Sequence, residues 1–345
     1  MFVLKRLQLG LIGGGRMGAV HAGVFAELAK AKDSIDFIAI ADNAPDVAEN
    51  LAKRLGVKKA YANIEAILDD AQVEAVFVAT PTFTHYEIVK MALNKGKHCL
   101  CEKPLTLDLE ESKELMLLAK AKNLILQIGF MRRFDPDVAS ARESVMRGEI
   151  GTPLIYKACH RDQSPPSPEF CDPQKSGGII IDNNIHEFDA GRFIFDDEIV
   201  EVFAQPGIVV DEGIGAVGDL DNATVQIRFE KGGIGQIDSS RNSCFGEDIR
   251  FELLGSQGTM FWGKLPMRGL TVATVDGAKV LTNLEEPERF IPAFEGQIKM
   301  FAKAVESGEK MGPDGEDSRR ALAVGLAAYR SIEMGRPVKI SEILG

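Results

Sequence analysis

The stretch LQLGLIGGGRMG at residues 7–18 decides the fold of this chain. An apolar run ends in three consecutive glycines, and a stretch with helical periodicity begins at residue 16. Gly13, Gly15 and Gly18 are spaced as G-x-G-x-x-G, and a chance match to that spacing most often marks a simple turn. What these glycines mean therefore depends on the elements that follow them.

Apolar runs alternate with amphipathic stretches as far as residue 130. The runs that we expect to form strands are LQLGLI (7–12), FIAIAD (37–42), EAVFVAT (74–80), KHCLCEKP (97–104) and LILQIGF (124–130), and the expected helices cover 16–30, 45–55, 83–95 and 108–122. Thr84 and Asp108 stand where the last two helices need N-terminal caps. Continuous apolar strands separated by helices are typical of a parallel sheet covered on both faces. We therefore predict an N-terminal α/β domain with a doubly wound Rossmann sheet over residues 1–130.

In that context the glycines predict a dinucleotide site. Gly13 permits the tight turn, Gly15 lets the backbone approach a pyrophosphate, and Gly18 allows close packing of helix on strand. The phosphates would bind at the helix N-terminus, where free N–H groups and the helix dipole favour anions. Asp42 ends the second strand; it can accept hydrogen bonds from ribose hydroxyls and would repel a 2′-phosphate. We therefore expect NAD rather than NADP.

Composition excludes several other classes of partner. A length of 345 residues predicts about two domains. The formal charge of −11 argues against nucleic acid or an anionic membrane as the main partner, and no apolar run is long enough to predict a membrane span. The five cysteines (99, 101, 159, 171 and 244) show neither a C-x-x-C pair nor zinc spacing. Reduced thiols and a cytoplasmic protein are expected.

Three further stretches carry candidate chemistry. TPTFTH (80–85) and EKP (102–104) follow the third and fourth strands, at the edge of the sheet where ligands bind. Lys103 is either a solvated loop charge or a donor that stabilises a developing alkoxide.

The third stretch, GGIIIDNNIHEFD (177–189), places Asp182, His186 and Asp189 on one face if it is helical. By itself this stripe fits a metal site, an acid–base catalyst, or a capped helix with a buried histidine.

Taken together, these motifs resemble the Gfo/Idh/MocA oxidoreductases over nearly the whole chain. The resemblance rests on GGGRMG, TPTFTH, CEKP, GFMRRFDP (129–136) and GGIIIDNNIHEFD. GFMRRFDP, the HRD triplet at 160–162 and the D-x-x-x-H pattern are most similar to the inositol 2-dehydrogenase branch. The resemblance implies that Lys103, Asp182 and His186 are catalytic and that the Lys103–Pro104 peptide bond is cis.

The resemblance also implies binding residues, with no metal among the ligands. The expected cofactor contacts are Gly13, Gly15, Arg16, Met17, Gly18, Asp42, Thr80, Pro81, His85, Glu102 and Lys103, and the expected substrate contacts are Lys103, Arg132, His160, Asp162, Asp182 and His186. His160 is either a polyol contact or an exposed histidine at a strand end. His85 is expected to cap its helix and face the cofactor, whereas His21 and His98 are expected to be structural. The inositol branch usually has asparagine at Asp162 and tyrosine near Phe245, so the identity of the substrate does not transfer.

For residues 131–345 the resemblance implies an α+β domain with a large open, mainly antiparallel sheet. Helices would cover one face, and the exposed face would form homodimers or tetramers. The sequence supports this domain, because runs such as PLIYKACHRD (153–162) and NATVQIRFEKGGIGQIDSSR (222–241) alternate apolar and polar residues around turns. LTVATVDGAKV (270–280) is a further candidate. QSPPSPEFCDPQKSG (163–177) is expected to be a loop that covers the substrate.

The predicted function is an NAD-dependent dehydrogenase of a cyclic polyol or sugar. His186 would take the hydroxyl proton while hydride leaves carbon, Lys103 would stabilise the same oxygen, and Asp182 would orient the imidazole and stabilise its cation. Two alternatives are an NAD-assisted sugar lyase or glycosidase that retains its cofactor, and a non-catalytic NAD(H)-binding regulator.

Overall fold

A computed structural model of the chain describes residues 6–263, 267–274, 277–282 and 287–345. It consists of two compact units. Unit 1 comprises Met1–Asp135 and Phe290–Arg320, and unit 2 comprises Pro136–Arg289 and Ala321–Gly345. The expected division into two continuous domains, 1–130 and 131–345, thus differs from the units, because residues 290–320 return to unit 1. Phe294 accounts for this return, since its ring packs edge-on against the buried ring of His21 at 4.6 Å.

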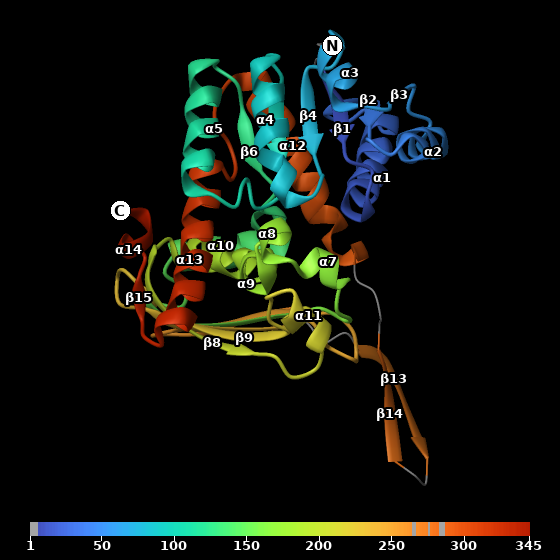
Figure 1. The fold of residues 1–345 in the computed structure, drawn as a ribbon. Helices are drawn as coiled ribbons and strands as arrows, with labels where there is room; N and C mark the ends of the chain where they lie inside the picture. Colours follow the sequence, from blue (N-terminus) through green and yellow to red (C-terminus); the bar gives the residue numbers. More distant parts are fainter. Residues whose placement is uncertain (1–5, 264–266, 275–276, 283–286) are drawn as a thin grey trace. The chain divides into compact units, whose positions relative to one another are not determined.

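Unit 1 is built on a six-stranded parallel sheet. Its elements are β1 (Leu7–Ile12), α1 (Arg16–Lys30), β2 (Ile35–Ala41), α2 (Pro45–Leu55), β3 (Lys59–Tyr61), α3 (Ile64–Asp69), β4 (Ala75–Val78), η1 (Thr82–Thr84), α4 (His85–Asn94), β5 (His98–Cys101), α5 (Leu109–Ala121), β6 (Leu126–Ile128), η2 (Met131–Phe134) and α12 (Ile291–Ser307). The short helix η3 (Pro287–Phe290) begins in unit 2, and its last residue, Phe290, belongs to unit 1. The strand order is β3-β2-β1-β4-β5-β6, and every neighbouring pair is parallel (Figure 1). The predicted Rossmann sheet is confirmed.

The central strands form because their residues are apolar on both faces. All four residues of β4 are buried, and β1 exposes only Gln8 in part. The Asp108 side chain caps α5 by accepting the N–H groups of Glu110 and Glu111, as predicted. The predicted Thr84 cap is wrong, because its hydroxyl bonds Thr80 and the Pro81 carbonyl instead of the N-terminus of α4.

Unit 2 is built on a seven-stranded mixed sheet. Its elements are α6 (Pro136–Met146), β7 (Pro153–Arg161), α7 (Pro168–Cys171), α8 (Pro173–Ser176), α9 (Gly178–Asp182), α10 (Asn184–Phe195), β8 (Ile199–Gly207), α11 (Glu212–Ala216), β9 (Asn222–Phe229), β10 (Ile234–Ser240), β11 (Asp248–Gly255), β12 (Thr259–Trp262), β13 (Met267–Thr274), β14 (Gly277–Thr282), β15 (Val338–Lys339) and α14 (Ser341–Leu344). The helix α13 (Gly315–Met334) begins in unit 1 and ends in unit 2. The sheet order is β12-β11-β7-β10-β9-β8-β15. Within this seven-stranded sheet, β7 and β10 are the one parallel pair among the described strands, and the other neighbouring pairs are antiparallel, so the predicted mainly antiparallel sheet is confirmed.

The two faces of this sheet differ. Helix α10 packs on β7 and β10, and α9 packs on β9 and β10. Figure 1 shows both helices on the same face of the sheet. Along β9 buried residues alternate with Thr224, Gln226 and Arg228, which are exposed. One face is therefore apolar and covered by helices, while the other carries polar side chains.

Residues 163–177, expected as a loop, contain the short helices α7 and α8, each begun by a proline. Within LTVATVDGAKV, β13 and β14 pair with each other, whereas residues 275–276 lie outside the described part of the chain. In the described residues we find no helix that is both long and apolar enough for a membrane span.

Candidate active site

The three motif glycines of unit 1 have separate structural reasons. Gly13 has φ +98°, and a Cβ there would lie 2.6 Å from the Ala79 carbonyl oxygen. A Cβ on Gly18 would lie only 1.9 Å from the Gly13 carbonyl oxygen, so α1 packs against the turn at that point. Around Gly15, the N-cap of α1, no heavy atom of the described residues other than its immediate neighbours in the chain lies within 4 Å of the Cβ position. The open space at Gly15, at a helix N-terminus, fits the pyrophosphate of a dinucleotide.

Asp42 lies directly after β2 and is tied to the glycine loop. One carboxylate oxygen accepts the backbone N–H of Gly14 at 2.7 Å, and the other accepts that of Ala44 at 2.8 Å. Each carboxylate oxygen has a second lone pair, so Asp42 retains acceptors for ribose hydroxyls. Arg16 and Met17 open helix α1, Arg16 exposed and Met17 half-buried, beside the space at Gly15.

His85 holds two loops of unit 1 together. Its Nε2 lies 2.9 Å from the Thr80 carbonyl oxygen and its Nδ1 lies 2.8 Å from the Pro104 carbonyl oxygen. The side chain is buried, and burial lowers the pKa of His85, while the two carbonyls oppose that shift. Both ring nitrogens are thus engaged within the fold, and a contact of His85 with the cofactor stays a prediction. Thr80 is half-buried and Pro81 is exposed in the same loop.

The EKP segment is anchored through its glutamate. Glu102 contacts Nε2 of the buried His21 at 2.7 Å, and its other carboxylate oxygen accepts the Lys103 N–H at 3.2 Å. Burial acts to raise the pKa of Glu102, but the hydrogen bond from His21 and the charge of Lys103 lower it overall. The Lys103–Pro104 bond is cis, as predicted. Through its contacts with His21 and with the Lys103 N–H, Glu102 therefore holds the segment that carries Lys103 in place.

The paired arginines of η2 have different environments. Arg133 is ion-paired with Asp317 at 2.7 Å, within unit 1. Arg132 is 2% exposed. A substrate contact by Arg132 stays a prediction.

In unit 2, the stretch 177–189 is helical. Asp182 is the last residue of α9, Asn183 continues in helical conformation, and His186 lies in the first turn of α10. Asp182 keeps 17% of its side chain exposed, and His186 is buried. Asp189 is buried and forms an ion pair with Arg192, whose guanidinium lies 3.8 Å away.

His160 and Asp162 lie on either side of Arg161, the last residue of β7. His160 is 8% exposed, which excludes the interpretation as an exposed strand-end histidine. Its Nε2 lies 3.7 Å from Asp162, its Nδ1 lies 3.5 Å from Glu187, and its ring lies 6.1 Å from that of His186. Within the described ranges, His160, Asp162 and Glu247 form the one group whose potential ligand atoms lie within 4.8 Å of one another. The stripe of Asp182, His186 and Asp189 is not such a group.

Arg241 is a residue that the sequence analysis missed. It follows β10, is 1% exposed, and bonds Asp182 at 2.9 Å and Asp162 at 3.3 Å. Two predicted substrate residues thus share one buried cation. The available signal was indirect: several aspartates were expected near the site, and SRNSC (240–244) places an arginine beside a strand end.

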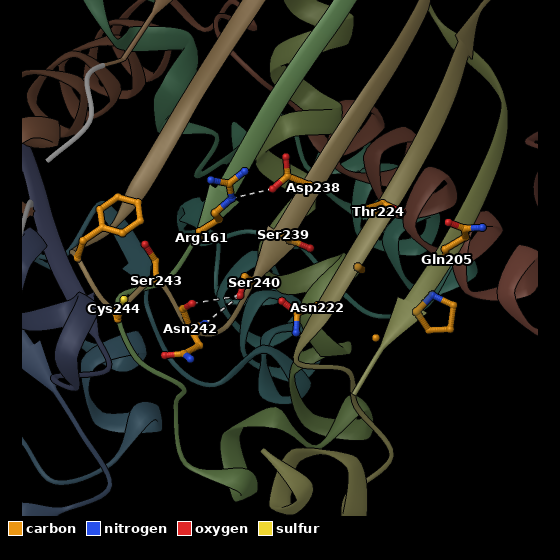
Figure 2. Close-up of a pocket in the computed structure, with 14 residues that line it drawn as sticks. Arg161, Gln205, Asn222, Thr224, Asp238, Ser239, Ser240, Asn242, Ser243 and Cys244 are labelled. Atoms are coloured by element: carbon orange, nitrogen blue, oxygen red, sulfur yellow. Dashed lines mark hydrogen bonds and ion pairs between the residues drawn. The ribbon is translucent and has the colours of Figure 1, made fainter. Parts of the chain in front are cut away.

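A separate hollow of about 580 Å³ lies in unit 2 (Figure 2). Its lining includes Gln205, Thr224 and Asp238, and Arg161 bonds Asp238 there at 2.7 Å. None of the predicted site residues lines this hollow. We therefore keep it apart from the candidate site.

Comparisons with known proteins cover both units. Residues 7–130 match the model of an oxidoreductase family with an NAD-binding Rossmann fold, and residues 138–261 match the GFO/IDH/MocA C-terminal domain. The myo-inositol 2-dehydrogenase of Thermotoga maritima is 38% identical over 98% of this chain and 100% of that protein. The scyllo-inositol 2-dehydrogenase (NAD(+)) of Bacillus subtilis is 35% identical over 97% of this chain and 96% of that protein.

A solved structure of scyllo-inositol dehydrogenase from Lactobacillus casei, with bound NAD(H) and scyllo-inositol, superimposes with a TM-score of 0.87 at 27% identity. The superposition covers 98% of this chain and 100% of that one.

Proposed function

We propose, from the premise that this chain belongs to the Gfo/Idh/MocA oxidoreductase family, that it is an NAD-dependent dehydrogenase of a cyclic polyol of the inositol class. The observation that carries the proposal is the full-length match to proteins named inositol 2-dehydrogenases. The open space at Gly15, at the N-terminus of α1, supports the part of the proposal that concerns NAD binding.

We assign a role to each of three residues. His186 accepts the hydroxyl proton of the substrate, and Lys103 donates a hydrogen bond to the same oxygen as negative charge develops there. Asp182 orients the imidazole of His186 and stabilises the imidazolium that forms there. Bound NAD supplies the acceptor for the hydride that leaves carbon. Gly13, Gly15, Gly18 and Asp42 would hold that cofactor.

The test is NADH formation, followed by absorbance, with a panel of inositols and aldoses. Wild-type protein should reduce NAD with at least one inositol. Lys103→Met should lower kcat/KM by about 10²–10³-fold, and His186→Gln by about 10²–10⁴-fold. Lys95→Met is the matched control, because Lys95 pairs with Asp69 on an exposed surface of unit 1.

Other outcomes would point elsewhere. If no polyol or sugar reduces NAD, the dehydrogenase proposal is wrong. A tightly copurifying cofactor with turnover but without net reduction would favour a lyase or glycosidase that retains its cofactor. NAD(H) binding without any turnover would favour a regulator.

We also propose that the protein works in the cytoplasm as a homo-oligomer, assembled through the exposed polar face of the seven-stranded sheet. Free thiols support the first part, since all five cysteines are unpaired and Cys99, Cys101, Cys159 and Cys171 are buried. Light scattering after size exclusion tests the second part. A monomer at micromolar concentration would contradict it.

A further inference from the structure

Arg241 is a buried cation that directly follows β10 in unit 2. Its side chain is 1% exposed, and its backbone N–H donates to the Asp221 carbonyl at 2.8 Å. A guanidinium is stable inside a protein only where anions and acceptors surround it. The surroundings of Arg241 therefore indicate what it holds.

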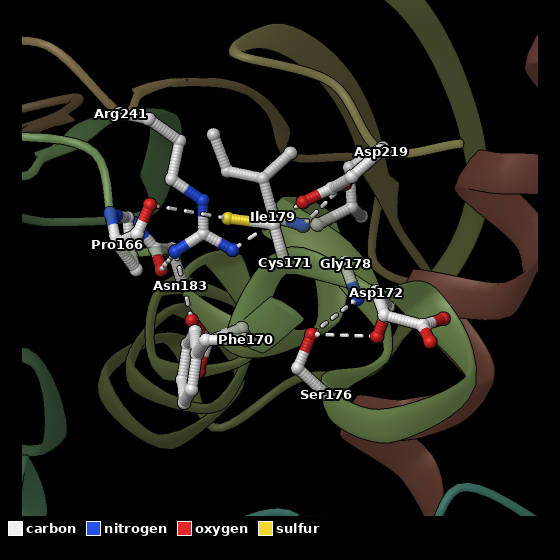
Figure 3. A network of polar contacts seen from close by, with 12 residues as sticks. Pro166, Phe170, Cys171, Asp172, Ser176, Gly178, Ile179, Asn183, Asp219 and Arg241 are labelled. Atoms are coloured by element: carbon white, nitrogen blue, oxygen red, sulfur yellow. Dashed lines mark hydrogen bonds and ion pairs between the residues drawn. The ribbon is translucent and has the colours of Figure 1, made fainter. Parts of the chain in front are cut away.

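Three carboxylates surround the guanidinium. Figure 3 shows one of them, Asp219, near Arg241 together with Asn183. Nη1 donates to Asp182 at 2.9 Å and lies 3.3 Å from Asp162, while Nη2 lies 3.5 Å from Asp219. Asn183 adds an amide oxygen 3.2 Å from Nη1. Burial alone would lower the pKa of Arg241, but these carboxylates raise it. The residue stays positively charged throughout the working range of pH.

Arg241 is buried, whereas two of its three carboxylate partners are partly exposed to solvent. Asp182 and Asp162 keep 17% and 22% of their side chains exposed, whereas Asp219 is fully buried. The guanidinium therefore lies behind two carboxylates that remain accessible.

The contacts of Asp182 and Asp162 with one nitrogen have an electrostatic consequence. Carboxylates that share a site repel each other, and without a counter-charge one of them takes up a proton. A protonated acid at either position would change the hydrogen bonds offered to a substrate.

Arg241 is also linked to the backbone of α9 through Asp219. Asp219, which lies 3.5 Å from Arg241, accepts the Ile179 N–H at 2.9 Å in the first turn of α9. Gly178 has φ +71°, and a Cβ there would lie 2.2 Å from the Tyr329 hydroxyl. The helix is thus fixed at its first turn by Asp219, and Arg241 holds Asp182 at its last residue.

We propose that Arg241 is a positioning residue that keeps Asp182 and Asp162 ionised together and fixes Asp182 at the end of α9. The kinetic part of this inference rests on the proposed dehydrogenase function, and its structural part does not. Arg241 does not touch the reacting atoms; it acts through the two carboxylates.

The test compares Arg241→Met and Arg241→Lys with Arg250→Met. Arg250 is a matched control, because it bonds Asp248 at 2.6 and 3.0 Å on the same sheet but faces none of the site aspartates. With an active wild type, Arg241→Met should lose at least about tenfold in kcat/KM near neutral pH, and the loss should shrink as pH rises and the shared proton leaves. Arg241→Lys keeps a positive charge, so its kcat/KM should be lower than that of wild type but should fall at acid pH in the same way. A loss for Arg241→Met that is the same at every pH would overturn the proposal.

A second measurement does not depend on activity. In Arg241→Met, one carboxylate is protonated in the folded protein at a pH where it is ionised in the unfolded chain, so folding is favoured at low pH. Relative to wild type, its melting temperature should fall as pH rises above about 4.

The double variant Arg241→Met with Asp162→Asn removes one of the two like charges, so this extra pH dependence should shrink again. The double variant also provides a folded comparison if the single variant is unstable. If the curves of melting temperature against pH are parallel for wild type and both variants, the inference is refuted, even if no polyol is ever oxidised.

Discussion

Gly18→Ala and Gly15→Ala should have opposite effects, although both change the same glycine motif. A Cβ on Gly18 would lie 1.9 Å from the Gly13 carbonyl oxygen and 2.9 Å from its carbonyl carbon. Both obstacles are backbone atoms, so no side-chain rotation relieves the overlap. Overpacking of this kind destabilises by about 1–3 kcal/mol, and we expect the upper end here. A loss of about 3 kcal/mol corresponds to a fall of roughly 6–12 °C in Tm for a unit of this size.

Gly15→Ala meets no such obstacle. The Cβ position is open to 4 Å, and the backbone angles of φ −63° and ψ −166° suit alanine. Glycine-to-alanine changes at compatible sites stabilise by about 0.4–1 kcal/mol through the unfolded chain. In contrast, the new methyl group enters the space where the pyrophosphate approaches the backbone. NAD affinity should therefore fall at least about tenfold, or about 1.4 kcal/mol.

Calorimetric melting without cofactor and titration calorimetry with NAD separate the two effects. The expected result is an unstable Gly18→Ala variant, and a stable Gly15→Ala variant that binds NAD weakly. Unchanged NAD affinity in Gly15→Ala would refute the assignment of this loop to the cofactor. A wild-type Tm in Gly18→Ala would refute the packing argument.

Three further predictions follow from single contacts. Asp42→Ala should destabilise the glycine loop by about 1–3 kcal/mol, because the N–H groups of Gly14 and Ala44 lose their acceptor. The same variant should shift the ratio of NAD to NADP affinity toward NADP. An unchanged ratio in a binding titration would contradict the role of Asp42 at the ribose. His85→Phe leaves the buried Pro104 carbonyl without its partner and should lower kcat/KM by about tenfold or more. His85→Gln should recover part of this loss. Equal activity of wild type, His85→Phe and His85→Gln would exclude a positioning role for His85. Burial lowers the pKa of His98, whose Nδ1 accepts the Ile125 N–H, so its contribution to the free energy of unfolding is complete above about pH 6.5 and is lost as pH falls below that value. Urea unfolding at several pH values should show a shallower acid loss in His98→Asn than in wild type, and identical slopes would count against this reasoning.

The sequence predicted most of unit 1 because its signals are local. Apolar runs located five of the six strands of its sheet, and the glycine spacing located the turn before α1. Lys59–Tyr61 escaped prediction because β3 is a short edge strand with no fully buried residue. The expected Thr84 cap failed because its hydroxyl found partners in its own turn.

Long-range contacts were beyond sequence reasoning. The return of α12 to unit 1 depends on Phe294 meeting His21, far away in the chain. Arg241 bonds Asp182 across a separation of 59 residues, and no local pattern distinguishes it from a solvated arginine. The roles of Lys103, Asp182 and His186 came from the resemblance to a family, since spacing alone left a metal site open.

Hydride transfer from a polyol carbon is the central claim, and isotope transfer measures it directly. The protein is incubated with NAD and an inositol deuterated at every ring carbon, and the reduced dinucleotide is weighed by mass spectrometry. We predict reduced dinucleotide that carries deuterium from the substrate, and loss of that product in His186→Gln. Reduced dinucleotide without deuterium, or bound NAD that no inositol or aldose reduces, would contradict the account.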